Sequence, residues 1–254
     1  MRDEGIRTAS CRVGIDAVSE ETAVDAITTP RRLKGWKPGL IVTPNMHHLA
    51  LLEKGSVLTP AYERASMILA DGWPVVVLAR MLGVKVRSRT TGSGLVDRLS
   101  KVRASGLAVS LIGGSSPESN RAAVAAFDDS GWRASGEDAP ASELADEYRT
   151  QRLVDRILER RPDLVIIGVG TPKQEQLALQ ILDAGFEGWI LCAGAGIDFL
   201  SGQAARSPLW LQRLGLEWFH RIVQEPKRLM RRYVSDVTPF ISVFLRSFQE
   251  VDRV

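Results

Sequence analysis

Five short apolar runs, none of which alternates with polar residues, constrain the fold of this chain more than any other feature. They span residues 39–43, 67–70, 107–112, 163–168 and 189–192, and stretches with helical periodicity separate them. Strands that are apolar at every position are typical of a parallel sheet covered on both faces, because crossover helices bury both sides. The pattern therefore predicts an α/β fold with a mostly parallel sheet and helices on both faces.

The predicted helices lie between these runs. We expect them over residues 45–54, from Pro74 onward, and over 117–128, 142–160 and 172–183. Pro74 and Pro117 fall in a first helical turn, where the missing N–H costs no hydrogen bond. The acidic stretch over residues 136–147 is typical of a surface loop that enters a helix.

The pattern changes after residue 205. Residues 206–254 show helical periodicity and no strand, so we divide the chain into an α/β catalytic domain, residues 1–205, and a helical C-terminal appendage, residues 206–254. Residues 206–232 hold seven Lys or Arg and two Glu, a charge of +5, although the whole chain carries only +3. The positive charge of the protein is therefore concentrated in the appendage.

An apolar stripe follows this basic segment, with helical spacing. It consists of Val237, Phe240, Ile241, Phe244, Leu245 and Phe248. Such a stripe either packs on the core or lies at a membrane interface.

Cellular location is indicated by what the sequence lacks. Its two cysteines cannot form a disulfide framework, residues 1–8 have no apolar signal-peptide core, and no run of 18 apolar residues occurs. We expect a cytoplasmic protein. The near-balanced total charge gives no sign of a nucleic-acid partner, and we expect none.

Polar and glycine residues follow all five apolar runs. Parallel α/β proteins bind ligands at this edge of the sheet, where glycines let the backbone approach a phosphate. The sequence thus predicts one cleft at the edge of a Rossmann-like sheet. The candidates are Thr43, Asn45, Asp71, Gly113, Gly170, Gln174 and Asp198.

Asp71 is the candidate general base, because burial at the end of an apolar run would raise its pKa toward the working range. The alternative is an Asp-Gly turn whose carboxylate caps the next helix. Thr43 and Asn45 also have the alternative role of helix caps. His47 and His48 would point about 100° apart on a helix, so we do not expect them to hold one metal.

Other candidates depend on amide and guanidinium chemistry. The Gln174 amide can read a base or sugar edge, whereas Glu175 in the same first turn is typical of a capping or dipole-stabilising residue. Arg221, Arg228 and Arg232 lie near one face of a helix, with Arg231 beside them. Arginine suits bidentate phosphate contact, and the alternative is a solvated basic face.

Several standard motifs are missing. The chain has no Asp-x-Asp pair, no P-loop, no nucleophile elbow and no complete dinucleotide fingerprint. We therefore expect neither a metal nor a cofactor.

Taken in order, the motifs resemble the WecG/TagA/CpsF family of bacterial glycosyltransferases over roughly residues 12–234. The motifs are Thr43-Pro-Asn45, Ala70-Asp-Gly72, Arg89-x-x-Gly92, Gly168-x-Gly170-x-Pro-Lys-Gln-Glu175, Gly194-x-Gly196-x-Asp198, Arg206-x-Pro208, Glu217-Trp-x-x-Arg221, Glu225-Pro-x-Arg228 and Arg231-Arg-Tyr233. The resemblance implies an inverting, metal-independent transfer of N-acetylmannosamine or its uronic acid from a UDP donor. The acceptor would be polyprenyl-diphosphate-linked N-acetylglucosamine at the cytoplasmic membrane face, in teichoic acid, common antigen or exopolysaccharide synthesis.

Residue roles follow from the same resemblance. Asp71 matches the proposed general base, and the tail arginines match residues thought to fold over the site and hold the diphosphate. Thr43 and Asn45 match donor-pocket residues, and Arg89, Gln174 and Asp198 match further pocket positions. The tail arginines are Arg221, Arg228 and Arg231. Family members often carry Asp where this chain has Gly94.

Two alternatives stay open. One is a non-catalytic module that binds a nucleotide sugar or a lipid phosphate within a polysaccharide assembly complex. The other is a nicotinamide-dependent oxidoreductase, against which the incomplete glycine fingerprints count. The sequence is also compatible with a homo-oligomer.

Overall fold

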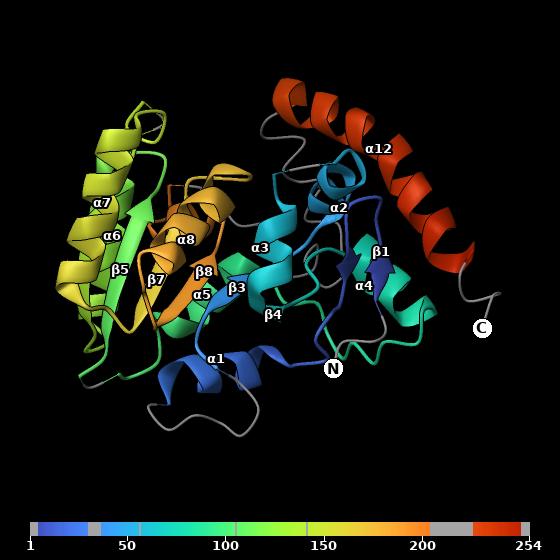
Figure 1. Cartoon of the computed structure of the whole chain (residues 1–254). Coiled ribbons are helices and arrows are strands. Elements are labelled where there is room, and N and C mark those ends of the chain that lie inside the picture. Colours follow the sequence, from blue (N-terminus) through green and yellow to red (C-terminus); the bar gives the residue numbers. More distant parts are fainter. Residues whose placement is uncertain are drawn as a thin grey trace.

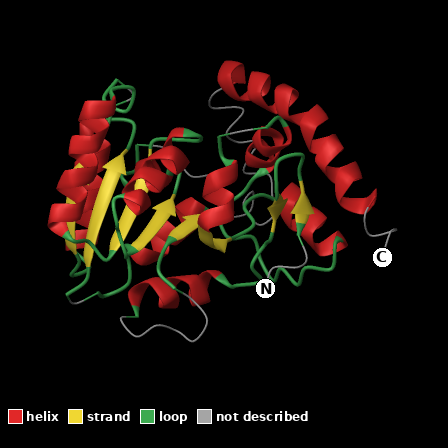
Figure 2. Cartoon of the chain, viewed as in Figure 1, coloured by secondary structure: helices red, strands yellow, loops and turns green. Residues whose placement is uncertain are grey.

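The computed structural model describes residues 5–29, 37–55, 57–104, 106–140, 142–203 and 226–249, with only the backbone at 226–228. At its centre is a six-stranded sheet in the order β4-β3-β8-β7-β5-β6, in which every neighbouring pair is parallel. Helices surround the sheet (Figures 1 and 2). The predicted mostly parallel α/β fold is confirmed.

All five predicted strands are present. They are β3 (Leu40–Val42), β4 (Ala65–Ile68), β5 (Ala108–Gly113), β7 (Leu164–Gly168) and β8 (Trp189–Cys192). The sixth, β6 (Arg133–Glu137), corrects the prediction of a surface loop from residue 136. It pairs only with β5, at the edge of the sheet, so it needs no continuous apolar sequence.

Five predicted helices are also present, namely α2 (Met46–Glu53), α4 (Trp73–Met81), α6 (Pro117–Asp128), α7 (Glu147–Arg160) and α8 (Lys173–Asp183). The start predicted for α7 at residue 142 is wrong, because Asp146 is the N-cap and its side chain accepts from the backbone N–H of Arg149. Unpredicted elements are the small antiparallel pair β1 (Ile6–Arg7) and β2 (Arg12–Val13), and the helices α1 (Glu20–Thr28), α3 (Thr59–Arg64), α5 (Gly92–Leu99) and α9 (Gly196–Leu200).

Two apolar clusters cover the two faces of the sheet. Leu40 and Val42 of β3 belong to one cluster, together with residues of α2, α4, α7 and α8. Ile41 belongs to the other, with residues of α1, α5 and α6. Because side chains alternate between the faces of a strand, this division shows that helices bury both sides.

The helix α12 (Pro226–Gln249) lies along the edge of the molecule and packs against α2 and β1 (Figure 1). Arg246 forms an ion pair with Glu53 at 3.0 Å, and His47 Nδ1 forms a hydrogen bond with Asp236 Oδ2 at 2.8 Å, so two polar contacts join α12 to α2. The predicted domain boundary at residue 205 falls in residues 204–225, outside the described part of the chain.

The predicted apolar stripe divides between two faces of α12. Phe240, Phe244 and Phe248 pack against the core, whereas Val237, Ile241 and Leu245 are about half exposed, at 47%, 51% and 56%. None of the helices in the described ranges is both long enough and apolar enough to span a bilayer.

Candidate active site

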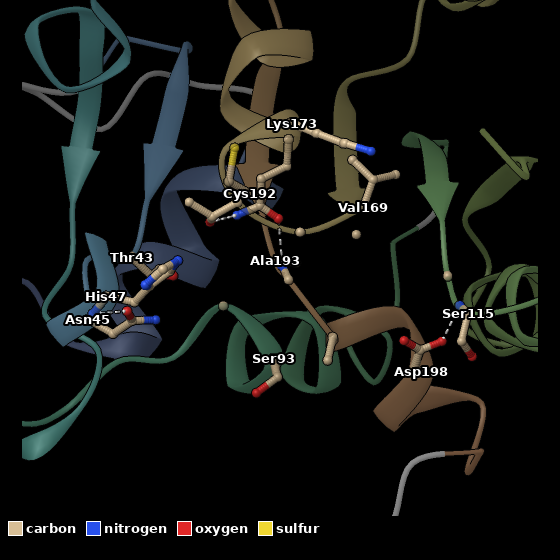
Figure 3. Close-up of a pocket in the computed structure, with 18 of the residues that line it drawn as sticks. Thr43, Asn45, His47, Ser93, Ser115, Val169, Lys173, Cys192, Ala193 and Asp198 are labelled. Atoms are coloured by element: carbon tan, nitrogen blue, oxygen red, sulfur yellow. Dashed lines mark hydrogen bonds between the residues drawn. The ribbon is translucent and has the colours of Figure 1, made fainter. Parts of the chain in front are cut away.

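A cavity of about 620 Å³ opens where β3, β7 and β8 end. Its walls include the loop after β5 and the first turns of α2, α5, α8 and α9. The structure brings together six of the candidates from the sequence in this polar cavity: Thr43, Asn45, Asp71, Gly170, Gln174 and Asp198. In Figure 3, Thr43, Asn45 and His47 lie on one side of it, and Ser115 and Asp198 lie on the other.

A second cavity, of about 430 Å³, adjoins the first. Its walls are more apolar and include Trp73 and Pro74 of α4, Tyr233 and Val237 of α12, and the candidate Arg89. The residues common to both cavities are Asn45, His47, Asp71, Ser93 and Arg232. These five side chains mark the junction of a polar and an apolar cavity.

The loop after β4 positions Asp71 at this junction. The backbone N–H of Asp71 donates to the carbonyl of Pro44 at 2.9 Å, which fixes the loop to the end of β3. Gly72, at φ 84°, is the N-cap residue of α4, and a glycine has no side chain with which to cap the helix. Asp71 is half-buried, at a point where a carboxylate can reach ligands in either cavity.

Asn45 is both a helix cap and a residue of the cavity walls. Its Oδ1 accepts from the backbone N–H groups of His47 at 3.0 Å and His48 at 3.3 Å, so it caps α2 as the alternative predicted. It also lines both cavities. Thr43, which is buried, lines the polar cavity alone.

Gln174 and Glu175 belong to a buried hydrogen-bond network beneath the polar cavity. Gln174 Nε2 donates to Glu175 Oε1 at 2.7 Å, and Gln174 Oε1 accepts from the backbone N–H of Gly194 at 3.0 Å. The Gln174 amide therefore holds the loop after β8 in addition to lining the cavity.

His48 completes this network. Its Nδ1 accepts from the backbone N–H of Asn45, so Nε2 carries the proton and donates to Thr171 Oγ1 at 2.6 Å. Thr171 in turn donates to Glu175 Oε1 at 3.1 Å. Burial raises the pKa of Glu175, but hydrogen bonds to the carboxylate, chiefly from His48 and Gln174, outweigh this, and the pKa lies below its usual value.

Asp198 ties α9 to the loop after β5. Its Oδ1 accepts from the backbone N–H of Ser115 at 2.6 Å (Figure 3). The same Oδ1 accepts from Ser119 Oγ at 2.7 Å. Gly113 does not line either cavity, but its φ of 92° requires glycine, and a Cβ there would lie 2.5 Å from Val169 Cγ1. Both residues therefore shape the loops of the cavity.

The arginines of the appendage differ in position. Arg231 is exposed and lines neither cavity, whereas its neighbour Arg232 lines both. Arg232 Nε is buried without a hydrogen-bond partner in the described part of the structure, and the guanidinium lies 5.6 Å from the centre of the Tyr233 ring. Arg221 and the side chain of Arg228 lie outside the described residues.

The sequence reasoning missed His47 and Ser93 as cavity residues. It named Arg232 from helical spacing, although the family motif matched Arg231 instead. His47 lies where α2 meets α12, and its Nδ1 is 2.8 Å from the buried Asp236. Partial burial lowers the pKa of His47 and Asp236 raises it, and with the nearby charge of Arg232 the pKa lies below its usual value. The available signal was weak, since only the position of His47 two residues after Asn45 connects it with the cleft.

Gly94 lies in the first turn of α5 and outside both cavities. A Cβ there would be 2.8 Å from both Glu20 Oε1 and Thr91 Oγ1. Thr91 caps α5 by accepting from the Gly94 N–H, also at 2.8 Å. An aspartate at this position would therefore face the Glu20 carboxylate and crowd the helix cap.

Comparison with known families gives one match that covers nearly the whole chain. The model of the glycosyl transferase WecG/TagA/CpsF family matches residues 8–252. The matched region includes every residue of both cavities and the whole of α12.

Proposed function

Because the chain belongs to the WecG/TagA/CpsF family of glycosyltransferases, which acts in cell-surface polysaccharide synthesis, we propose that it is an inverting, metal-independent UDP-sugar hexosyltransferase. The donor sugar is N-acetylmannosamine or its uronic acid. The acceptor is polyprenyl-diphosphate-linked N-acetylglucosamine. The observation that carries this proposal is the half-buried Asp71 carboxylate at the junction of a polar and an apolar cavity.

Each cavity suits one substrate. The polar cavity has glycine-rich loops and helix N-termini, which favour a nucleotide diphosphate. The apolar cavity, with Trp73, Pro74 and Val237 in its walls, suits the first isoprene units of the lipid acceptor. Substrates held in this way would place the acceptor hydroxyl and the anomeric carbon on either side of the junction.

Asp71 then acts as the general base. Its carboxylate takes the proton of the acceptor hydroxyl while that oxygen attacks the anomeric carbon. The bond from this carbon to the UDP oxygen breaks on the opposite side, so the configuration inverts and UDP leaves as the anion. Thr43, Asn45, Gly170, Gln174 and Asp198 line or shape the donor side, and Arg89 lies on the acceptor side.

Positive charge is needed at the departing diphosphate. We assign this role to Arg232, whose Nε has no hydrogen-bond partner in the described structure, together with Arg221 and Arg228 of the matched tail motifs. Arg231, which the resemblance also names, is exposed and outside both cavities, so we give it no part in this step. A fixed guanidinium stabilises the charge that develops on UDP, the role that a metal ion has in many other transferases.

The test is the Asp71→Asn variant. We expect UDP release with lipid acceptor to fall at least about a hundredfold, the usual contribution of a general base, while UDP affinity by calorimetry stays near that of the wild type. Asp155→Asn, an exposed carboxylate on α7, is the matched control. Near-normal turnover by Asp71→Asn would refute the assigned role.

The same assay addresses the alternative of a non-catalytic binding module. A wild-type protein that binds UDP-sugar and lipid acceptor but releases no UDP would be such a module. A panel of UDP-sugars identifies the donor. Family membership in a group of transferases counts against the nicotinamide-dependent oxidoreductase.

We further propose that the protein lies on the inner face of the cytoplasmic membrane through its appendage. The outward face of α12 carries five large apolar side chains at helical spacing, each 47–68% exposed: Met230, Val234, Val237, Ile241 and Leu245. A face of this kind favours the interface of a bilayer. Truncation after residue 205 should lower both activity and sedimentation with anionic liposomes.

A further inference from the structure

The face of α4 that points away from the core is apolar, although it belongs to the α/β domain and not to the appendage. Trp73, Val77 and Met81 follow one another at intervals of four residues and are 36%, 48% and 54% exposed. Residues at this spacing share one side of a helix. Val75, Val76, Leu78 and Ala79 occupy the opposite side and are buried in the core.

Basic residues lie at the end of α4 and in the segment that follows it. Residues 73–89 contain four basic residues and no acidic residue. The segment after α4 is held against the helix by Arg80. Its Nε donates to the Val86 carbonyl at 2.9 Å, and a terminal guanidinium nitrogen donates to the Arg87 carbonyl at 3.0 Å. Lys85 and Arg87 are exposed on this segment. The apolar face of α4 therefore has a basic margin.

The face is continuous with the outward face of α12 at the apolar cavity. Trp73 and Pro74 form one side of that cavity, and Tyr233 and Val237 form another. Val237 is also one of the five outward side chains of α12. Both helices lie at the end of the molecule away from α6 and α7 (Figure 1).

From this arrangement we infer that α4 is a second membrane-contact surface, and that its partner is an anionic phospholipid bilayer. The inference rests on the proposed function, in which the apolar cavity receives a lipid acceptor. With α4 on one side and α12 on the other, the cavity opens toward the bilayer, and the acceptor enters it without passing through water.

A bilayer fits this surface better than a second copy of the chain. An isologous contact through α4 would bring two basic margins together, whereas an anionic bilayer neutralises them. Each Lys or Arg near such a surface is worth about a fivefold change in partitioning. The Lys85→Ala/Arg87→Ala variant should therefore bind vesicles of phosphatidylcholine and phosphatidylglycerol about 25-fold more weakly, with little change on pure phosphatidylcholine.

The experiment measures sedimentation of the full chain with these vesicles. Val77→Asp/Met81→Asp tests the apolar face, and both double variants leave α12 and the cavity residues intact. Tyr148→Asp is the matched control, because Tyr148 is an exposed ring on α7, 71% accessible, at the other end of the molecule. We expect both α4 variants to bind these vesicles more weakly than the wild type, and the control to bind them as the wild type does.

Thermal unfolding and UDP release with a short-chain, water-soluble acceptor show that the variants are folded and competent. Wild-type sedimentation by Val77→Asp/Met81→Asp would overturn the inference. So would a dimer in gel filtration that this variant converts to a monomer, because the occupant would then be a second copy. Loss of vesicle binding supports the inference even if no UDP-sugar proves to be a substrate, so the two proposals fail separately.

Discussion

Arg232 offers the sharpest test of how the appendage takes part in the reaction, because its neighbour Arg231 provides an internal comparison. Both are arginines of α12, one residue apart, yet Arg232 lines both cavities and Arg231 is exposed. The Nε of Arg232 is buried with no hydrogen-bond partner in the described structure, and an unsatisfied buried donor of this kind is unusual in a purely structural residue. We predict that Arg232→Ala impairs catalysis more than Arg231→Ala does.

The size of the effect follows from the bond that is lost. A hydrogen bond to a charged group is worth about 1.5–3 kcal/mol, or about 10- to 150-fold in kcat/KM. If the contact forms mainly with the departing UDP, the loss appears in kcat and not in KM. Arg232→Lys should recover only part of the activity, because an ammonium cannot make the bidentate contact.

The assay is continuous UDP release with lipid acceptor, combined with thermal unfolding of each variant. We expect Arg232→Ala to cost less than about 1 kcal/mol of stability, since its Nε has no hydrogen-bond partner to lose among the described residues. Equal losses in Arg232→Ala and Arg231→Ala, or full activity in Arg232→Ala, would refute this reasoning. A large loss of stability with the loss of activity would also refute it, since Arg232 would then be a structural residue.

Two further predictions concern the packing around the site. Burial holds the pKa of His47 below its usual value, so as the pH falls the unfolded chain takes up a proton at a higher pH than the folded chain does. The free energy of unfolding should therefore decrease as the pH drops below about 6.5. Urea unfolding at pH 7.5 and 5.5 measures this, and His47→Gln should lose part of that pH dependence; an unchanged dependence would exclude His47 as its source. Gly94→Asp should destabilise the fold by about 1–3 kcal/mol, because its Cβ would lie 2.8 Å from Glu20 Oε1. Gly94→Asp/Glu20→Gln should recover part of this loss in thermal unfolding, and no recovery would mean that the carboxylates do not interact.

The strands of the sheet could be predicted from sequence because burial on both faces leaves a continuous apolar run. The edge strand β6 has no such run, and only its pairing with β5 defines it. The helix α5 was missed for a different reason, since glycines 92 and 94 in its first turn weaken a helical pattern. A Cβ at Gly92 would lie 3.0 Å from Ala193 Cα, so tertiary packing on the loop after β8 determines this residue.

The sequence could predict which residues meet in the cavity, because they follow strands, but not what each residue does there. Thr43, Asn45, Asp71 and Asp198 were predicted to share a cleft because each follows an apolar run, and all four line one cavity. Nothing in the sequence indicates that Gln174 binds the N–H of Gly194, twenty residues away. Helical spacing alone also could not indicate which tail arginine faces the site, because that depends on how α12 is rotated against α2.

That rotation is determined by α2, and this connects the appendage to the reaction. The first turn of α2 supplies Asn45 and His47 to the wall between the cavities, and its last turn supplies Glu53 to the ion pair with Arg246. His47 both lines the wall and binds Asp236, which is one helical turn after Arg232. A displacement of α12 would therefore move Arg232 and disturb His47 at the same time. For this reason we expect substitutions at the interface of α2 and α12 to affect transfer even where they touch neither substrate.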